Sequence, residues 1–419
     1  MLNGPIKNLA LVAYYFPPIG GAGVQRAVYL SRYLSEFGWN VRIITAQPFD
    51  YPATDDSLID SIPPGVAVHR VGVIEQRQST EPDRELTSEF LSGIGGRVKE
   101  YLRLPDGKIY SMLSFAKELK RLHAESSFDT VLTTSPPPSI HLAGLFGRKS
   151  LGIKWIADFR DVWYPGGFDI YPTRVHVELS KRMKDHLIRH ADTIVVVTEG
   201  HHSQLIANYP DRDDNIKLIP NGFEESLFDS EAGADKSGER KIGYVGTLND
   251  LTYVPEFFEM LVGICSEAGS VVDIRGIVTD EIRSHLKSLD PEGGLIRIGE
   301  YIPHAEAIRF RSESSINLVT LAPAASLGAT IPGKMYEVLR TRRPVIAVAG
   351  RDTDCWRLAE RFEDVVLVDA ANVPASRDAV LNLIRDSGGP IPIRPGIEEY
   401  SWHSLAVKYD TVLREVLWK

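Results

Sequence analysis

Short, continuous apolar runs alternate along this chain with segments in which apolar residues recur every three or four positions. Such runs are typical of strands buried on both faces of a parallel sheet, and the spaced pattern predicts the helices that cover it. In the first half we expect strands at residues 9–14, 41–46, 66–71, 130–134, 154–157, 193–198 and 217–220. Helices are expected at residues 22–38, 84–104, 113–124 and 140–151. This order predicts an α/β, doubly wound parallel sheet.

The same alternation starts again after a polar break. Asn221 and Gly222 end the last strand of the first half, and residues 224–240 are acidic and poor in apolar side chains. Further strands are expected at 241–245, 271–275, 295–298, 316–321, 345–348 and 365–368, with a helix at 254–268. We therefore predict a first domain at 1–222 with an insertion at about 49–110, a second domain at 223–400, and a helical tail at 401–419.

Composition narrows the class of protein. Lys and Arg number 47 against 56 Asp and Glu, a net charge of −9 that argues against a general nucleic-acid binder. Cys265 and Cys355 lack the spacing of a zinc site, so a reduced, cytosolic protein is the simplest inference. The sequence offers neither a secretory leader nor a run long enough to span a membrane.

A glycine pair, Gly20 and Gly21, lies between the first strand and the first helix, where backbone amides can approach a ligand closely. It is not a dinucleotide fingerprint, because Arg26 stands where G-x-G-x-x-G needs its third glycine. An NAD site therefore loses most of its support.

The stretch 330–348 combines a helix start, two charges and a strand. Thr330 is expected to cap a helix whose first turn contains Pro332, and Lys334 and Glu337 leave one face of it, one turn apart. A lysine where the helix dipole is already positive suggests a bound anion, so the pair fits a diphosphate and its ribose. A simple surface ion pair between the two side chains fits the spacing equally well.

Four motifs along the chain share one resemblance. They are F-P-P-I-G-G at 16–21, I-P-N-G-F at 219–223, G-Y-V-G-T at 243–247, and G-K-M-Y-E-V-L-R-T-R-R-P-V-I at 333–346. In order and spacing the chain resembles the GT-B nucleotide-sugar glycosyltransferases, in particular the retaining glycosyltransferase family four, also called group 1. The resemblance implies two Rossmann-like domains, with a C-terminal helix crossing back to the first domain. It also implies sugar transfer from a nucleotide diphosphate sugar, a co-substrate rather than a cofactor, in the second domain.

The resemblance assigns roles to individual residues. The position of Glu337 holds the ribose, that of Lys334 contacts the diphosphate, and the Gly20–Gly21 loop faces the phosphates. Many members carry a second glutamate eight residues earlier, where this chain has Ala329. We assign donor binding to Gly20, Gly21, Thr247, Arg275, Thr330, Gly333, Lys334 and Glu337, with Arg275 standing in for a basic residue absent after Thr247.

The first domain is expected to hold the acceptor, which the sequence leaves open between a glycan, a lipid-linked molecule and a small molecule. Asp158, Arg160 and Asp161 follow a strand, where open α/β sheets bind ligands, and the resemblance places a histidine of the family near here. Arg160 and Asp161 are therefore assigned as catalytic, together with Lys334, and residues 164–167 as an acceptor loop. A structural ion-pair cluster is the other interpretation.

The resemblance also implies retention of anomeric configuration, with the leaving phosphate deprotonating the acceptor and Asp161 as the alternative base. No D-x-D motif follows a strand, so we expect no divalent metal. Two rivals are a nucleotide-sugar 2-epimerase and a non-catalytic nucleotide-sugar-binding scaffold. The epimerase would need histidines facing the sugar, and His141, His176 and His304 are interpreted as surface or packing residues.

A basic amphipathic segment at residues 174–190 predicts one further helix. Such a helix can lie on an anionic membrane, which would suit a lipid-linked acceptor at the inner face of the membrane. Packing on the sheet with a solvated basic face is the competing interpretation.

Overall fold

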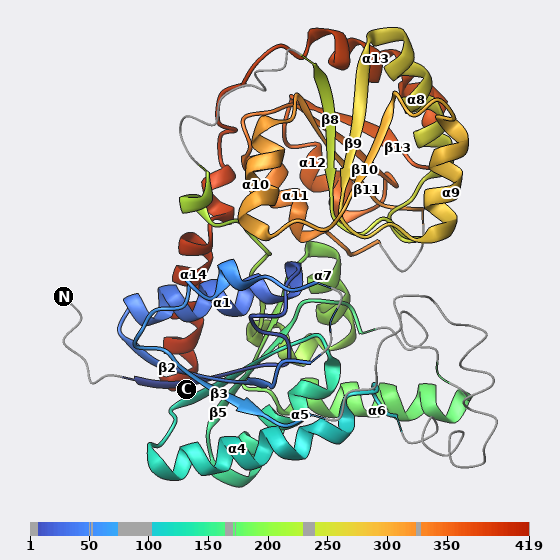
Figure 1. Ribbon diagram of the computed structural model, residues 1–419. Helices are drawn as coiled ribbons and strands as arrows, with labels where there is room; N and C mark the ends of the chain where they lie inside the picture. Colours follow the sequence, from blue (N-terminus) through green and yellow to red (C-terminus); the bar gives the residue numbers. More distant parts are fainter. Residues whose placement is uncertain are drawn as a thin grey trace. The chain divides into compact units, whose positions relative to one another are not determined.

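The computed structural model describes residues 7–49, 51, 53–73, 103–163, 171, 173–228, 239–323 and 328–418. The chain divides into two compact units, residues 1–220 with 402–419, and residues 221–401 (Figure 1). The expected helix at 84–104 lies almost wholly outside the described residues, as does the expected acceptor loop at 164–167. None of the helices within the described ranges combines the length and apolar character that a membrane crossing requires.

Unit 1 is built on a parallel sheet of seven strands in the order β3-β2-β1-β4-β5-β6-β7. The strands are β1 (Lys7–Ala13), β2 (Trp39–Ala46), β3 (Ala67–Val71), β4 (Thr130–Thr134), β5 (Lys154–Phe159), β6 (Thr193–Val196) and β7 (Ile216–Leu218). All seven were expected from their apolar runs, with ends shifted by one or two residues. Nearly every residue of β1, β4 and β5 is buried, as strands covered on both faces require.

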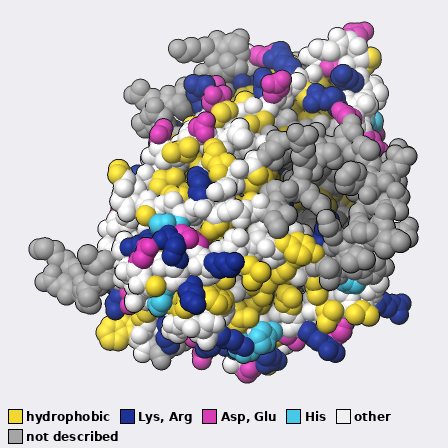
Figure 2. All heavy atoms as spheres, turned by 60° about the horizontal axis from the view of Figure 1, so that its bottom comes forward, with side chains coloured by type: hydrophobic (Ala, Val, Ile, Leu, Met, Phe, Trp, Pro, Cys, Tyr) yellow, Lys and Arg dark blue, Asp and Glu magenta, His cyan; other side chains and the backbone are white. Residues whose placement is uncertain are grey.

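Four helices, α4 (Met112–Glu125), α5 (His141–Leu151), α6 (Arg174–His190) and α7 (Glu199–Asn208), contribute buried side chains to one core of unit 1. The segment expected to be basic and amphipathic is α6 over its whole predicted length. Leu187 and Ile188 near its end are buried, whereas Val175 and Leu179 near its start are exposed. Figure 2, which brings the lower side of Figure 1 forward, shows Lys and Arg side chains among hydrophobic ones.

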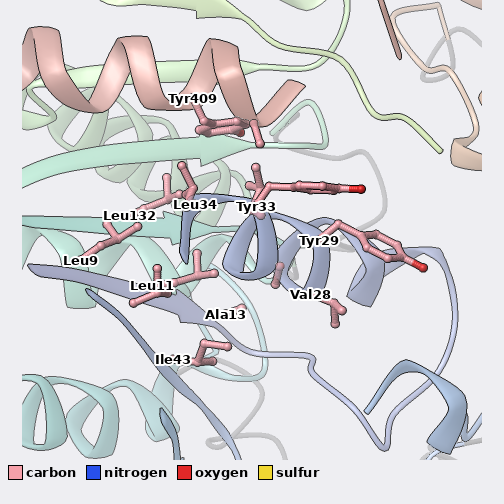
Figure 3. Close-up of a cluster of buried hydrophobic side chains, with 14 of the residues drawn as sticks. Leu9, Leu11, Ala13, Val28, Tyr29, Tyr33, Leu34, Ile43, Leu132 and Tyr409 are labelled. Atoms are coloured by element: carbon pink, nitrogen blue, oxygen red, sulfur yellow. The ribbon is translucent and has the colours of Figure 1, made fainter. Parts of the chain in front are cut away.

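The other core of unit 1 joins the sheet to two helices that are far apart in sequence, α1 (Ala22–Glu36) and α14 (Trp402–Trp418). Leu9, Leu11 and Ile43 from the sheet lie beneath α1, and Tyr409 extends from α14 (Figure 3). Tyr29 of α1 stacks on Trp402, with ring centroids 6.0 Å apart. The C-terminal helix is therefore part of the first unit, because its apolar face completes that unit's core.

Unit 2 has a parallel sheet of six strands in the order β10-β9-β8-β11-β12-β13. The strands are β8 (Arg240–Val245), β9 (Ser270–Arg275), β10 (Ile296–Gly299), β11 (Ile316–Thr320), β12 (Val345–Ala349) and β13 (Val365–Asp369). All six were expected. The described helices are α8 (Pro255–Ala268), α9 (Asp280–Leu289), α10 (His304–Glu313), α11 (Gly333–Arg340), α12 (Asp354–Ala359) and α13 (Arg377–Asp386).

The helices of unit 2 form two separate cores on the sheet. Side chains of α8, α9 and α13 belong to one core, and those of α11 and α12 to the other, where Phe223 and Tyr400 join them. Helix α8 was expected from its apolar spacing, and α11 from its start signals and polar pattern. Helices α9, α10, α12 and α13 were not singled out from the sequence, and each is only six to ten residues long.

Candidate functional site

The candidate site of unit 2 begins at the turn after β8. Gly246 there has φ of 138°, a backbone conformation that residues other than glycine rarely adopt. A Cβ on Gly276 would lie 2.3 Å from the carbonyl oxygen of Gly246, so the two turns following β8 and β9 touch backbone to backbone. A Cβ on Gly246 itself would come within 3.3 Å of Lys334 Nζ. Glycine at this position therefore brings the backbone next to the lysine's charge.

Lys334 occupies the first turn of α11, as the sequence predicted, but the start of the helix differs in detail. Pro332, and not Thr330, is the N-cap residue, with φ −59° and ψ 136°, and it makes no side-chain cap hydrogen bond. The expectation that Thr330 is the cap was wrong, because proline fixes a φ suited to this position and lies directly before Gly333, the first helical residue. The N-cap residue therefore offers the first-turn amides no side-chain acceptor.

The ammonium of Lys334 lies over the ring of Tyr244, 3.8 Å from its centroid. Desolvation lowers the pKa of Lys334 to about 7, and the nearby Arg311 guanidinium acts in the same direction. Among the described residues no carboxylate forms an ion pair with this ammonium, and Glu337 opposes the shift only as a smaller, longer-range influence. Lys334 and Glu337 are therefore not the surface ion pair that their spacing allowed. A cation held in this way is suited to a bound anion.

Glu337, one turn further along α11, is only 2% exposed. Its two carboxylate oxygens have different partners on α10: His304 Nε2 donates to Oε1 at 2.7 Å, and Arg311 donates to Oε2 from Nη1. Both partners are buried as well. Sequence reasoning missed this arrangement, and it interpreted His304 as a surface or packing residue.

The end of α11 is held by a residue that the sequence pattern did not single out. Arg394 is 3% exposed, and its guanidinium donates to the carbonyl oxygens of Leu339 at 2.6 Å, Thr341 at 2.9 Å and Arg343 at 2.8 Å. These carbonyls would otherwise lack partners at the helix C-terminus. Arg340, in the last turn of the helix, pairs with Glu225.

Two other residues assigned to the donor are placed differently. Arg275, proposed as a substitute cation, is held by Asp273 of its own strand, with Nε 2.8 Å from Oδ1, and is partly exposed. Thr247 is exposed, and its carbonyl oxygen accepts from the Tyr244 hydroxyl at 2.8 Å. Tyr244 therefore connects the Thr247 turn to Lys334 through its ring.

In unit 1 the glycine loop and the segment after β5 come together. Gly21, with φ of 92°, is the N-cap of α1, while the amide of Gly20 donates to the carbonyl oxygen of Ala53 at 2.8 Å. Arg160 donates to the carbonyl oxygens of Gly23, at 2.6 Å, and of Ser135. The guanidinium of Arg160 thus connects the start of α1 to the end of β4.

Asp158 and Asp161 differ in burial. Asp158 is fully buried and accepts from Arg26 Nε at 2.9 Å and Thr134 Oγ1 at 2.7 Å. Asp161 is exposed to solvent. Partial desolvation by the surrounding protein raises the pKa of its carboxyl, and the charge of Arg160 acts in the opposite direction. The ion-pair cluster expected here therefore centres on Arg26 and Asp158, and the Asp161 side chain is exposed to solvent.

Arg26, noted in the sequence for breaking a glycine motif, is one of the largest fully buried side chains. It also donates from Nη2 to the Tyr409 hydroxyl at 2.5 Å and from Nη1 to the carbonyl oxygen of Pro220 at 2.8 Å. A buried guanidinium needs partners for its donors, which it finds on β5, on α14 and on the segment after β7.

The other two histidines have local partners. His141 contacts Thr133 Oγ1 at 2.8 Å and packs on Phe159, and burial lowers its pKa to about 3. His176 lies in the first turn of α6 with Nδ1 2.7 Å from Thr173 Oγ1. Among the described residues no group of three or more His, Cys, Asp or Glu side chains is arranged to hold a metal ion.

Comparison with known proteins agrees with this architecture. Residues 20–222 match the family described as Glycosyl transferase 4-like domain. No curated protein sequence gives a significant match to the chain.

Solved structures show the fold. Sucrose-phosphate synthase from Thermosynechococcus elongatus is 15% identical, with a TM-score of 0.66 over 98% of this chain and 99% of that one. HepE from Anabaena, in complex with UDP and glucose, is 12% identical, with a TM-score of 0.66 over 98% and 100%. A putative UDP-N-acetylglucosamine 2-epimerase from Listeria monocytogenes is 11% identical, with a TM-score of 0.57 over 98% and 96%. Both units together thus have the GT-B fold that the sequence motifs implied.

Proposed function

We propose that this chain, whose residues 20–222 match the family described as Glycosyl transferase 4-like domain, is a glycosyltransferase that transfers a sugar from a nucleoside diphosphate sugar held by unit 2. The observation that carries the proposal is the environment of Lys334. This lysine lies over an aromatic ring and beside a glycine turn, with its pKa lowered to about 7. An ammonium so desolvated is stabilised when an anion binds to it.

A diphosphate fits this position because two kinds of donor converge on it. Lys334 lies in the first turn of α11, whose N-cap residue Pro332 makes no side-chain cap hydrogen bond and whose dipole is positive at this end. Glu337 follows one turn later, the distance from a diphosphate to the ribose attached to it. Thr330 and Gly333 lie at the same helix start and are proposed to line the donor.

The proposed reaction breaks the bond between the anomeric carbon and the diphosphate oxygen, and the acceptor hydroxyl oxygen forms the new bond. Negative charge develops on the leaving diphosphate, and Lys334 with the α11 amides would stabilise it. The acceptor proton passes to the leaving phosphate, with Asp161 as the alternative base. We propose retention of anomeric configuration and no divalent metal, as the family resemblance implies.

Arg160 and Asp161 contribute differently in this proposal. Because Arg160 is held by two backbone carbonyls, it positions the segment after β5. Asp161 is open to solvent and is the group that an acceptor hydroxyl can reach. The loop at Gly20 and Gly21 is proposed to contribute to phosphate binding through Gly21, because the Gly20 amide already donates to a carbonyl oxygen.

A membrane-associated acceptor is one form of the proposal, and α6 supports it. Val175 and Leu179 are 65% and 44% exposed, and the exposed Lys181 and Arg182 lie close by in the same helix. Exposed apolar and basic residues together are what an anionic lipid surface binds. The test is sedimentation with phosphatidylglycerol vesicles. Sedimentation that does not depend on salt and is unchanged by Lys181→Glu with Arg182→Glu would refute the membrane-associated acceptor and leave a glycan or small-molecule acceptor.

The epimerase alternative is supported by the fold similarity to the Listeria protein. The scaffold alternative is supported by Ala329, which stands where many family members carry a sugar-binding glutamate. A panel of nucleotides and nucleotide sugars in a thermal-shift assay tests the donor proposal first. A ligand at a hundred times its dissociation constant should stabilise by about 2.7 kcal/mol. No shift with any nucleoside diphosphate would refute the proposal. Free epimerised nucleotide sugar would favour the epimerase, and binding without turnover a scaffold.

A further inference from the structure

We propose that Tyr409 of the C-terminal helix α14 is a positioning residue for the transfer reaction, because its hydroxyl completes a buried Arg26–Asp158 pair that holds the end of β5. Arg160 and Asp161, which are assigned to the acceptor side, directly follow this strand. The inference rests on the proposed function, since it assumes that the segment after β5 takes part in sugar transfer. It gives three buried residues of unit 1 a role in that reaction.

The hydroxyl of Tyr409 contacts both members of the ion pair. It accepts from Arg26 Nη2 at 2.5 Å and from Nε at 3.2 Å, and it also hydrogen-bonds the Asp158 carboxylate. Arg26 donates to the same carboxylate from Nε at 2.9 Å and from Nη2 at 3.1 Å. These three side chains, here called the Arg26 cluster, are fully buried. Tyr409 points from α14 toward the sheet, so a residue 383 positions from Arg26 completes the pair (Figure 3).

Burial shows what the charges of the Arg26 cluster contribute. Two ions that leave water lose their hydration, so apolar side chains of similar size would often fill the same space with equal or better stability. The charges add direction, because bidentate contact with a guanidinium fixes the plane of a carboxylate. Burial in the first place, and then Asp158, raise the pKa of the Tyr409 hydroxyl well above its usual value, so the hydroxyl keeps its proton as a donor. The cluster therefore specifies an orientation of the end of β5.

The Arg26 cluster is connected to the assigned acceptor residues through the end of β4. The carboxylate of Asp158 accepts from Thr134 Oγ1 at 2.7 Å, and its carbonyl oxygen accepts from the amide of Ser135 at 3.1 Å. Arg160 donates from Nε to the carbonyl oxygen of the same Ser135. Asp158 and Arg160 thus hold one short stretch of chain together, and a displacement of one displaces the other.

The charges of the Arg26 cluster also act on Arg160 and Asp161 directly. Burial lowers the pKa of Arg160, the charges of Asp161 and Asp158 raise it, and that of Arg26 lowers it. Desolvation raises the pKa of Asp161, Arg160 lowers it, and Asp158 raises it. Because electrostatic interactions weaken with distance, both residues lie near the cluster. A rotation of the Asp158 carboxylate would therefore change both the position and the charge of the group that an acceptor hydroxyl meets.

The test removes single contacts from the full chain. Tyr409→Phe keeps the ring, whose centroid lies 5.2 Å from the Arg26 guanidinium carbon, and deletes only the hydroxyl. Thr134→Val removes another hydrogen bond to the carboxylate with little change in shape. Asp410→Ala is the matched control, because Asp410 is the neighbour of Tyr409 on α14 and accepts from Trp39 Nε1 at 2.7 Å. The control thus also loses a contact between α14 and the rest of unit 1.

Three quantities are measured for each variant. Calorimetry gives the affinity for UDP, ADP and GDP. Release of the nucleoside diphosphate from UDP-, ADP- and GDP-sugars, with water as the acceptor, gives kcat and KM. Hydrogen–deuterium exchange gives the protection of the amides in residues 156–163. Turnover and binding are thereby separated from each other and from the stability of the segment itself.

In Tyr409→Phe and Thr134→Val we expect kcat to fall about ten- to a hundredfold, the loss that a small displacement near the reacting groups causes. KM and nucleotide affinity should stay within about twofold, because Lys334 and the start of α11 belong to unit 2. Exchange in residues 156–163 should become faster. Asp410→Ala should lower Tm as much as Tyr409→Phe does, since each loses a hydrogen bond to a charged group, but keep the wild-type kcat and exchange.

Equal kcat values in Tyr409→Phe and Asp410→Ala would show that the Arg26 cluster only supports the fold and would overturn the inference, while the proposed function would stand. A parallel loss of kcat and nucleotide affinity in Tyr409→Phe, or unchanged exchange in residues 156–163, would overturn it as well. Absence of both nucleotide binding and turnover in the wild type would refute the proposed function and this inference with it. Should Thr134→Val not fold, Tyr409→Phe and Asp410→Ala still decide between these outcomes.

Discussion

Replacing Lys334 by methionine should make the unliganded protein more stable while it abolishes donor binding. The side chain keeps its length and apolar contacts with Tyr244, whereas the desolvated charge is removed. Burial lowers the pKa of Lys334 from 10.5 to about 7. The folded protein therefore resists protonation of this group at a pH where the unfolded chain is protonated.

The magnitude follows from proton linkage. A shift of this size costs the folded state about 4 kcal/mol at pH 7, an upper limit since the half-buried side chain keeps some contact with water. Loss of the cation–π contact with Tyr244 offsets about 1–2 kcal/mol of that. We expect a net stabilisation of about 2 kcal/mol, or a rise in Tm of about 4–8 °C for a unit of this size.

The dependence on pH identifies the cause. The folded-state pKa lies below the unfolded one, so the unfolded chain binds more protons between pH 7 and 10.5, and wild-type stability rises across that window. The advantage of Lys334→Met should therefore be largest at and below pH 7 and vanish above pH 10.5. Urea unfolding at pH 7 and at pH 10, with and without a nucleotide sugar, measures both effects.

Lys241→Met is the matched control, because Lys241 belongs to the same unit and its Nζ also lies over an aromatic ring, 4.8 Å from the centroid of Phe310. This control should lose a few tenths of a kcal/mol and keep its donor-induced stabilisation. If Lys334→Met lowers the free energy of unfolding at pH 7 as much as the control does, the reasoning is refuted. Lys334 would then stabilise the fold rather than carry a desolvated charge that only a bound anion offsets.

Three further predictions concern the same helix and its neighbours. Wild-type affinity for a nucleotide sugar should fall about 50-fold from pH 7 to pH 9, because Lys334 must be protonated to bind, and Lys334→Arg should remove this dependence in calorimetry. Gly246→Ala should lower both the binding free energy of the donor and the free energy of unfolding by about 1–2 kcal/mol, owing to its positive φ and the nearby ammonium. Gly263→Ala, where a Cβ meets no atom, should not, and equal effects would contradict the proposed approach of backbone to ligand. Arg394→Met should lower the free energy of unfolding in urea by about 3–5 kcal/mol, because it leaves the C-terminal carbonyls of α11 without donors. The control Arg342→Met, at an exposed position, should cost less than about 1 kcal/mol. A smaller cost for Arg394→Met would mean that water replaces the guanidinium.

The pattern of apolar residues was enough to place the thirteen described strands and the long helices, including α14 and the full extent of α6. Buried parallel strands need side chains that are apolar on both faces, so a short run marks them without any tertiary information. The helix start at Pro332 and the positions of Lys334 and Glu337 on one face also follow from local geometry.

Only the tertiary structure decided what those two charges do. Spacing allowed an ion pair between Lys334 and Glu337, but the fold gives the carboxylate to His304 and Arg311 and leaves the ammonium over Tyr244. Helix α10 was hidden in the sequence because its buried face includes His304, Arg311 and Ser312, polar side chains that weaken the apolar pattern. Contacts between residues that lie 26 and 33 positions apart depend on how strands and helices stack, which no local period encodes.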